Sequence, residues 1–128
     1  EMEREAFAQA DKGGAFGEGG ELFDDVLARM VEGFEALLAD KDWTTALVVA
    51  HEGVNRVLLS YLLVGSMAAV APLQQDLACI NVIDVDEASG GEPIIFVKSV
   101  NVTPDNPTKL GMNRTSLEEI FQPYEDKV

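Results

Sequence analysis

The sequence predicts an α/β fold with a mostly parallel sheet, and three observations support this. An amphipathic helical pattern covers residues 21–40, a short apolar run follows at residues 46–50, and helical spacing resumes after Gly53. A continuous apolar run is typical of a strand buried on both faces, as strands of parallel sheets are. Helix, strand, sharp turn and helix in succession are the signature of the α/β class.

The helix predicted over residues 21–40 has the clearest pattern in the chain. Its apolar residues recur at three- and four-residue spacing and form one stripe, made of Phe23, Val26, Leu27, Met30, Val31, Phe34, Leu37 and Leu38. Glu21, Asp24 and Asp25 lie in or near its first turn, where the helix dipole favours acidic side chains.

The segment after His51 predicts a second helix, which Gly65 can close. Residues 57–73 are uncharged, but Ser60, Gly65, Ser66 and Pro72 interrupt them. A membrane-spanning helix needs about 17–25 apolar residues, so we interpret this stretch as a buried core segment.

Two further strand-like runs cover residues 78–85 and 94–102, and Gly90-Gly91 lies in the connection between them. This arrangement predicts a β-hairpin with a longer loop. Residues 115–119, Thr-Ser-Leu-Glu-Glu, offer a capping box and a short terminal helix.

The composition limits the classes of partner. The formal net charge of the 128 residues is -14, which disfavours binding to nucleic acid or to an anionic membrane surface. Cys79 is the single cysteine and lies in an apolar run, so we expect an inert, buried thiol and a reducing, cytoplasmic environment. We interpret residues 1–20, which are rich in glycine, as a flexible flap or loop segment, and residues 21–128 as the folded unit.

His51 is the candidate catalytic residue. It stands at the end of the predicted strand, and Gly53 permits a tight turn into the next helix. In open α/β sheets the site lies beyond the carboxyl ends of the strands, and a helix beginning there presents unpaired N–H groups that favour an anion. A histidine at that position can donate a hydrogen bond to a phosphate oxygen. The alternative is a structural histidine bonded to the backbone.

Residues 47–56, Leu-Val-Val-Ala-His-Glu-Gly-Val-Asn-Arg, resemble the second-histidine motif of the histidine phosphatase (phosphoglycerate mutase-like) superfamily. Gly19-Gly20-Glu21, followed by a helix carrying Arg29, is similar to the Gly-Gly-Glu-Ser helix start of that family. The later run Val100-Asn101-Val102-Thr103-Pro104 resembles its closing strand, so the resemblance spans Gly19 to Asp105.

The resemblance implies a three-layer sandwich with a mostly parallel sheet that is incomplete at its N-terminal side, residues 21–128 being the C-terminal half of the domain. It gives His51 the role of the second histidine of the phosphate pocket. The family's nucleophile is another histidine, in an Arg-His-Gly motif that this sequence lacks, and the family's general acid also has no counterpart here. It implies no metal and no cofactor.

Glu52, Gly53, Asn55 and Arg56 are the candidate substrate-binding residues beside His51. Glu52 stands where the family's motif more commonly has glycine after the histidine. Its carboxylate would repel phosphate unless the side chain points away and only its N–H faces inward. Asn55 could bind substrate or only cover the helix start. Arg56 could pair with an anion or with Glu52, four residues earlier.

The resemblance therefore implies phosphoryl transfer on a phosphorylated small molecule, by phosphomonoester hydrolysis or mutase chemistry through a phosphohistidine. This sequence alone would be a poor enzyme, because the nucleophile creates the intermediate that divides the reaction into easier steps. One alternative is a non-catalytic protein that binds a phosphorylated ligand or a protein partner. Another is an interaction fragment whose open sheet edge pairs with a second copy, as a homo-oligomer.

Overall fold

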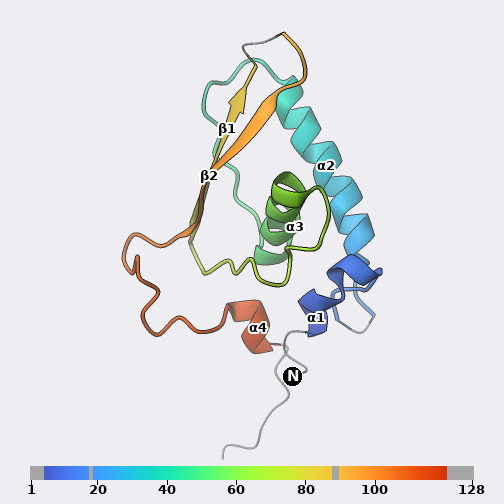
Figure 1. Ribbon diagram of the computed structural model, residues 1–128, viewed down its shortest axis with the longest axis vertical. Coiled ribbons are helices and arrows are strands. Elements are labelled where there is room, and N and C mark those ends of the chain that lie inside the picture. Colours follow the sequence, from blue (N-terminus) through green and yellow to red (C-terminus); the bar gives the residue numbers. More distant parts are fainter. Residues whose placement is uncertain (1–4, 18, 88–89, 121–128) are drawn as a thin grey trace, which may run out of the picture.

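The computed structural model describes residues 5–17, 19–87 and 90–120 (Figure 1). The elements follow in the order α1 (Glu5–Ala8), a 3-10 turn η2 (Ala10–Lys12), α2 (Phe23–Ala39), α3 (Glu52–Val64), β1 (Ile80–Asp86), β2 (Ile94–Val102) and α4 (Ser116–Ile120). Helices and strands share one small domain, so the predicted α/β class is confirmed.

The hydrophobic core lies where α1, the first half of α2 and α3 meet. Its buried members are Phe7, Ala10, Phe23, Val26, Met30, Val57, Met67 and Val70. The predicted stripe on α2 therefore faces the core, although from Phe34 onward its residues are only half-buried. Burial of these side chains removes apolar area from water and holds the two long helices together.

Part of the glycine-rich N-terminal segment packs on this core. The Phe16 ring stacks on Phe23 with 4.0 Å between centroids, and Phe7 meets both rings edge-on or tilted. Residues 1–4 and 18 of the predicted flap lie outside the described residues, and the division of the chain at residue 20 stays a prediction.

Helix α3 ends at Gly65, as the sequence predicts, but it begins directly after His51, so Gly53 lies within its first turn and does not form a tight turn before it. Gly65 adopts a left-handed conformation (φ 71°), and its N–H donates to the carbonyl of Tyr61 at 2.9 Å. Val57, Met67 and Val70 within residues 57–73 are buried, but Leu63 and Val64 are 48% and 55% exposed, so only part of the predicted core segment is buried. In the part of the chain that is described, no helix combines the length and the apolar character that crossing a bilayer requires.

Strands β1 and β2 form the predicted hairpin. They pair antiparallel, with irregular register around Val82, and they are the whole of the sheet among the described residues. The mostly parallel sheet of a three-layer sandwich is thus not confirmed, because the strand expected to lie beside them does not pair.

Residues 46–50 are where the structure departs most from the sequence analysis. The prediction of a buried strand is wrong here: within the part of the chain that is described the segment has no ladder partner, and Leu47, Val48 and Val49 are 91%, 63% and 88% exposed. In Figure 1 it runs as a plain trace from the far end of α2 to the start of α3. A strand needs a neighbour to bind its N–H and C=O groups, and no described segment supplies one.

The capping box predicted at the last helix is confirmed. The Thr115 N–H donates to Glu118 Oε2 at 3.0 Å, and the Glu118 N–H donates back to Thr115 Oγ1 at 3.4 Å. These reciprocal bonds satisfy donors at the start of α4 that the short helix cannot pair internally.

Candidate functional site

His51 occupies the N-cap position of α3, and its side chain is exposed. Its backbone is extended (φ -70°, ψ 157°), and its imidazole makes no capping bond to the helix. The first helical bond runs from the Asn55 N–H to the His51 carbonyl, at 3.0 Å. The N–H groups of residues 52–54 precede that bond, so they have no carbonyl within the helix to bind. Among the described residues, an imidazole without a capping bond and three N–H groups without a carbonyl partner in the helix thus share one helix end, where the dipole favours an anion.

Gly53 is buried at this helix start because an aromatic ring lies directly against it. A Cβ atom on Gly53 would come within 2.6 Å of Cε1 of Phe16 and 2.8 Å of its Cζ. The glycine therefore lets the ring cover the first turn of α3. Its N–H remains among the unpaired donors, which is the part of Gly53 that could contact a ligand.

The Glu52 carboxylate is engaged on the side of the helix that faces α4. Its Oε2 accepts from Nε and Nη2 of Arg56, at 3.0 and 2.7 Å. Its Oε1 accepts from the N–H of Leu117 in α4, at 3.3 Å. The side chain is 11% exposed. The structure thus shows the pairing between Glu52 and Arg56 that their four-residue spacing suggested.

Arg56 lies in the interior, with a fully buried side chain. Its Nη1 donates to the carbonyls of Val70 and Ala71, at 3.2 and 2.9 Å. Its Nη2 also reaches Thr115 Oγ1 at 3.2 Å and Glu118 Oε1 at 2.8 Å. These bonds, with those to Glu52, use every N–H of the guanidinium. Contact with a substrate would require some of these bonds to break.

The Arg56 guanidinium also lies over the ring of Phe7, which belongs to the N-terminal part of the chain. The central carbon of Arg56 is 3.9 Å from the centroid of the Phe7 ring. Arg56 therefore joins α3 to segments that come before and after it in the sequence.

Asn55 lies at the surface of the join between residues 46–50 and α3. Its Nδ2 is 3.5 Å from the carbonyl of Ala50, a long hydrogen bond that ties the helix start to the preceding segment. This position matches the alternative in which Asn55 covers the helix start.

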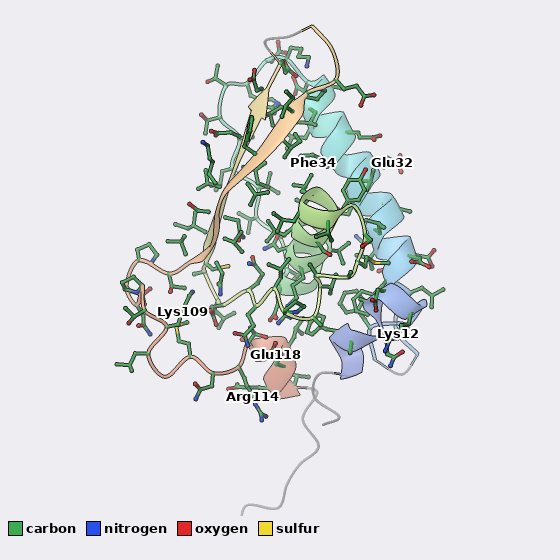
Figure 2. The ribbon with its side chains drawn as sticks, viewed as in Figure 1. Lys12, Glu32, Phe34, Lys109, Arg114 and Glu118 are labelled. Carbon is green, nitrogen blue, oxygen red and sulfur yellow. The ribbon has the colours of Figure 1, made fainter. Side chains whose placement is uncertain are left out.

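Glu118, labelled at α4 in Figure 2, carries the second carboxylate bound to Arg56. Burial by itself raises the pKa of this carboxyl group, but hydrogen bonds from Arg56, the Thr115 N–H and Gln74 outweigh that effect and hold the pKa below its usual range. The group is therefore held ionised by its donors.

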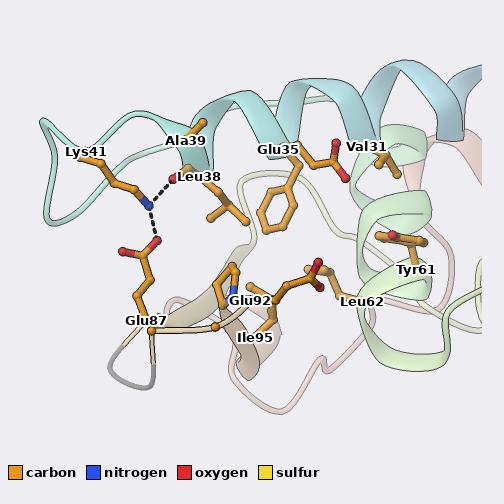
Figure 3. Close-up of a pocket in the computed structure, with 14 residues that line it drawn as sticks. Val31, Glu35, Leu38, Ala39, Lys41, Tyr61, Leu62, Glu87, Glu92 and Ile95 are labelled. Atoms are coloured by element: carbon orange, nitrogen blue, oxygen red, sulfur yellow. Dashed lines mark hydrogen bonds and ion pairs between the residues drawn. The ribbon is translucent and has the colours of Figure 1, made fainter.

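A separate cleft of about 580 Å³ lies between α2, α3 and the β-hairpin (Figure 3). Apolar side chains such as Phe34, Leu38 and Ile95 form its walls, with acidic side chains at Glu35 and Glu92. Lys41 at its edge donates to the Leu38 carbonyl and to Glu87. The sequence analysis did not predict this cleft, because it depends on how the hairpin sits against α2.

Neither a metal centre nor a reactive thiol emerges from the described residues. They contain no group of three or more histidine, cysteine or acidic side chains that could hold a metal ion. Burial is the main cause that raises the pKa of the Cys79 thiol above its ordinary value, which lowers its thiolate fraction.

The comparison with protein families gives a match that covers most of the chain. The family profile of the histidine phosphatase superfamily (branch 1) matches residues 1–92 of the 128 residues. The chain belongs to the histidine phosphatase superfamily. The matched range includes His51 and the whole of α3, so the resemblance noted at residues 47–56 is confirmed at the level of the superfamily. Searches of curated proteins and of solved structures found no match.

Membership of the histidine phosphatase superfamily indicates phosphoryl transfer in general, on phosphorylated substrates. The structure brings His51, Glu52, Gly53, Asn55 and Arg56 together at one helix end, with His51 in solvent and Arg56 inside. The contribution of α4 to this end was missed by the sequence analysis. The four-residue spacing indicated that Glu52 could pair with Arg56. The sequence analysis assigned Glu118 only to a capping box and did not predict that it binds Arg56.

Proposed function

We propose that this chain supplies the phosphate-binding half of a histidine phosphatase domain, in which His51 and the first turn of α3 hold the transferring phosphoryl group. The observation that carries the proposal is the exposed, uncapped imidazole of His51 at the head of a 13-residue helix. The imidazole N–H and the N–H groups of residues 52–54 would bind the non-bridging oxygens and stabilise charge in the transition state.

The reaction we propose is phosphomonoester hydrolysis or the related mutase reaction, through a phosphohistidine. A histidine nitrogen attacks phosphorus, the bond to the alcohol oxygen breaks, and an acid protonates the departing alcohol. Water, or another hydroxyl in a mutase, then takes the phosphoryl group from the histidine. His51 is the only histidine in the 128 residues, and the resemblance gives it the binding role. The nucleophile would therefore come from a segment outside this sequence.

The exposed residues 46–50 support a place for that segment. Their backbone has no ladder partner among the described residues, and Leu47 and Val48, neighbours along the segment, are both exposed. A partner strand on either side would convert the segment into the buried strand of a mostly parallel, three-layer sandwich. Its carboxyl end would then present His51 beside the incoming strand.

The charge of the chain also bears on the proposal. With a net charge of -14, the protein repels phosphate at long range. Local donors must overcome this repulsion, and within this chain they are His51 and the N–H groups of α3. The missing segment would have to add arginine side chains. We therefore expect weak phosphate binding and no measurable turnover from the 128 residues alone.

The single histidine makes a direct test possible. Titration of the protein with inorganic phosphate, followed by proton NMR, should shift the Cε1–H signal of His51, while sodium chloride at the same ionic strength should not. Lys98→Ala is the matched control, because it removes an exposed cation from β2 and should leave the phosphate response unchanged. A His51 signal that ignores phosphate up to the highest soluble concentration would contradict the proposed site.

Turnover is tested separately with an aryl phosphate and the intact mass of the same sample. A larger mass with activity that His51→Ala abolishes would establish that the catalytic segment exists in the natural protein. Activity from a protein of 128 residues would contradict the need for a second segment.

A further inference from the structure

We infer that Arg56 is a positioning residue of the phosphate site: together with α4 it holds the Glu52 carboxylate away from the N–H groups of the first turn of α3. The inference rests on the proposed function, since it concerns the anion site that His51 and these N–H groups would form. It assigns Arg56 an indirect role in place of direct contact with a substrate.

The position of Glu52 creates the need for such a residue. It is the first residue of α3, so its charge lies beside the donors that would bind phosphate. A carboxylate at the start of a helix can accept from those same N–H groups and would compete with the ligand as well as repel it.

The structure gives the Glu52 carboxylate other donors. Both bonds to Oε2 come from Arg56, and the bond to Oε1 comes from Leu117 in α4. Its oxygens are therefore engaged on the α4 side, 2.7 Å from the guanidinium, whose single positive charge Glu52 shares with Glu118. Among the described residues, the donors to its oxygens are thus Arg56 and Leu117, and no N–H of the first turn is one of them.

Arg56 can hold Glu52 because its own position is fixed from several sides. The carbonyls of Val70 and Ala71 anchor one end of the guanidinium, and Glu118 binds the other at 2.8 Å. The Phe7 ring covers its face at 3.9 Å. A fully buried arginine with this many partners cannot rotate outward without losing several bonds at once. The clamp, defined as Glu52, Arg56 and Glu118, is therefore rigid.

The test compares phosphate affinities of folded variants, with inorganic phosphate as the probe and the His51 Cε1–H signal as the readout. Arg56→Met releases the Glu52 charge beside the anion, so we expect about fivefold weaker binding, the effect of a unit charge a few ångströms away in water. The double variant Glu52→Gln/Arg56→Met removes the released charge, and its affinity should return to within about twofold of the natural protein.

Arg29→Met provides the matched control. Arg29 makes a two-point pair with Glu21, both bonds at 2.9 Å, but the pair is exposed and belongs to the start of α2. Loss of this arginine changes the net charge equally and should leave phosphate affinity within about twofold. A purely structural role for Arg56 would lower stability in both Arg56 variants and leave phosphate affinity unchanged, which would overturn the inference.

Glu52→Gln alone keeps the test decisive if Arg56→Met does not fold. Because the Glu52 carboxylate is held on the α4 side beside the positive guanidinium, this variant should bind phosphate within about twofold of the natural protein. A gain of fivefold or more would mean that the clamp does not shield the site. If the natural protein itself shows no phosphate response, the proposed function fails first and the positioning role fails with it.

Discussion

Gly53 lies where the core packs against the proposed site, and the packing there requires a residue without a Cβ atom. Phe16 lies against its Cα, and the same ring stacks on Phe23 with 4.0 Å between centroids. Phe7 meets Phe16 edge-on at 6.3 Å. The ring is therefore enclosed by aromatic neighbours and has little room to move when a side chain is added at Gly53.

Gly53→Ala should lower the free energy of unfolding by about 1–3 kcal/mol, the usual cost of inserting a methyl group into a packed site. Urea denaturation followed by circular dichroism measures this. Gly33→Ala is the control: Gly33 lies in the middle of α2, where a Cβ atom would meet nothing within 4 Å. That substitution should stabilise the protein by up to about 1 kcal/mol through helix propensity. Equal effects of the two substitutions would show that the Phe16 contact is not formed.

For single residues, the sequence predicted which residues belong to the candidate site better than it predicted whether their side chains are buried. His51 and Gly53 could be recognised because a strand-like run, a histidine and a glycine occur in immediate succession. The burial of Arg56 could not, because it requires Glu118, 62 residues further along the chain, to supply a second carboxylate. An arginine one turn into an amphipathic helix reads as a surface residue until that long-range partner is known.

Among the elements, α3 depends on a polar contact at its C-terminal half. The Ser60 side chain is fully buried. Its hydroxyl donates to the Ser66 carbonyl at 2.7 Å and accepts from the Ala69 N–H at 2.9 Å. One side chain thus satisfies two backbone groups of the turn that follows the helix, and this turn carries Val70 and Ala71 to Arg56.

Ser60→Ala should therefore destabilise the protein by about 1–3 kcal/mol, because it removes both hydrogen bonds that the buried hydroxyl makes. Thermal and urea unfolding of the purified variant would measure the loss. Ser66→Ala is the comparison: its hydroxyl accepts a single bond, from the exposed Ala68 N–H at 3.3 Å, and its removal should change stability by no more than about 0.5 kcal/mol. A tolerated Ser60→Ala would mean that water replaces the hydroxyl.

The elements that the sequence predicted well are those with local causes. Helix α2 follows from its apolar spacing, α3 from Gly65 at its end, α4 from its capping box, and the hairpin from Gly90-Gly91 between two β-rich runs. Residues 46–50 differ, because a strand buried on both faces is defined by its neighbours. Their sequence is apolar enough for such a strand, but the described residues offer no strand to pair with them, so they are exposed.

For the whole molecule, acidity is the dominant physical property. Aspartate and glutamate number 23 against 9 lysines and arginines, so self-repulsion opposes folding at neutral pH. Acidification relieves this repulsion, yet it also protonates carboxylates that the folded state uses as acceptors. The two effects have opposite sign, and a difference between matched variants can separate them.

Glu118 is the carboxylate for which this loss of hydrogen bonding on protonation is clearest. Its donors hold its folded-state pKa below the ordinary value of 4.5, so its stabilising contribution is present in full above that value. The contribution is lost as pH falls through the lowered folded-state pKa. At pH 7 the natural protein should exceed Glu118→Gln by about 1–3 kcal/mol in unfolding free energy, because the charged hydrogen bonds to Arg56 and Gln74 are weakened.

This difference between the two proteins should shrink below pH 4.5 as the natural carboxyl group also becomes neutral, and urea midpoints from pH 7 to pH 3 would record it. Glu119→Gln removes the same charge from the next residue of α4, which is exposed. Its effect should be small and nearly constant with pH, since both proteins then differ only in a surface charge. A difference between the natural protein and Glu118→Gln that stays constant down to pH 3 would show that Glu118 acts through packing, and the clamp around Arg56 would then not depend on its charge.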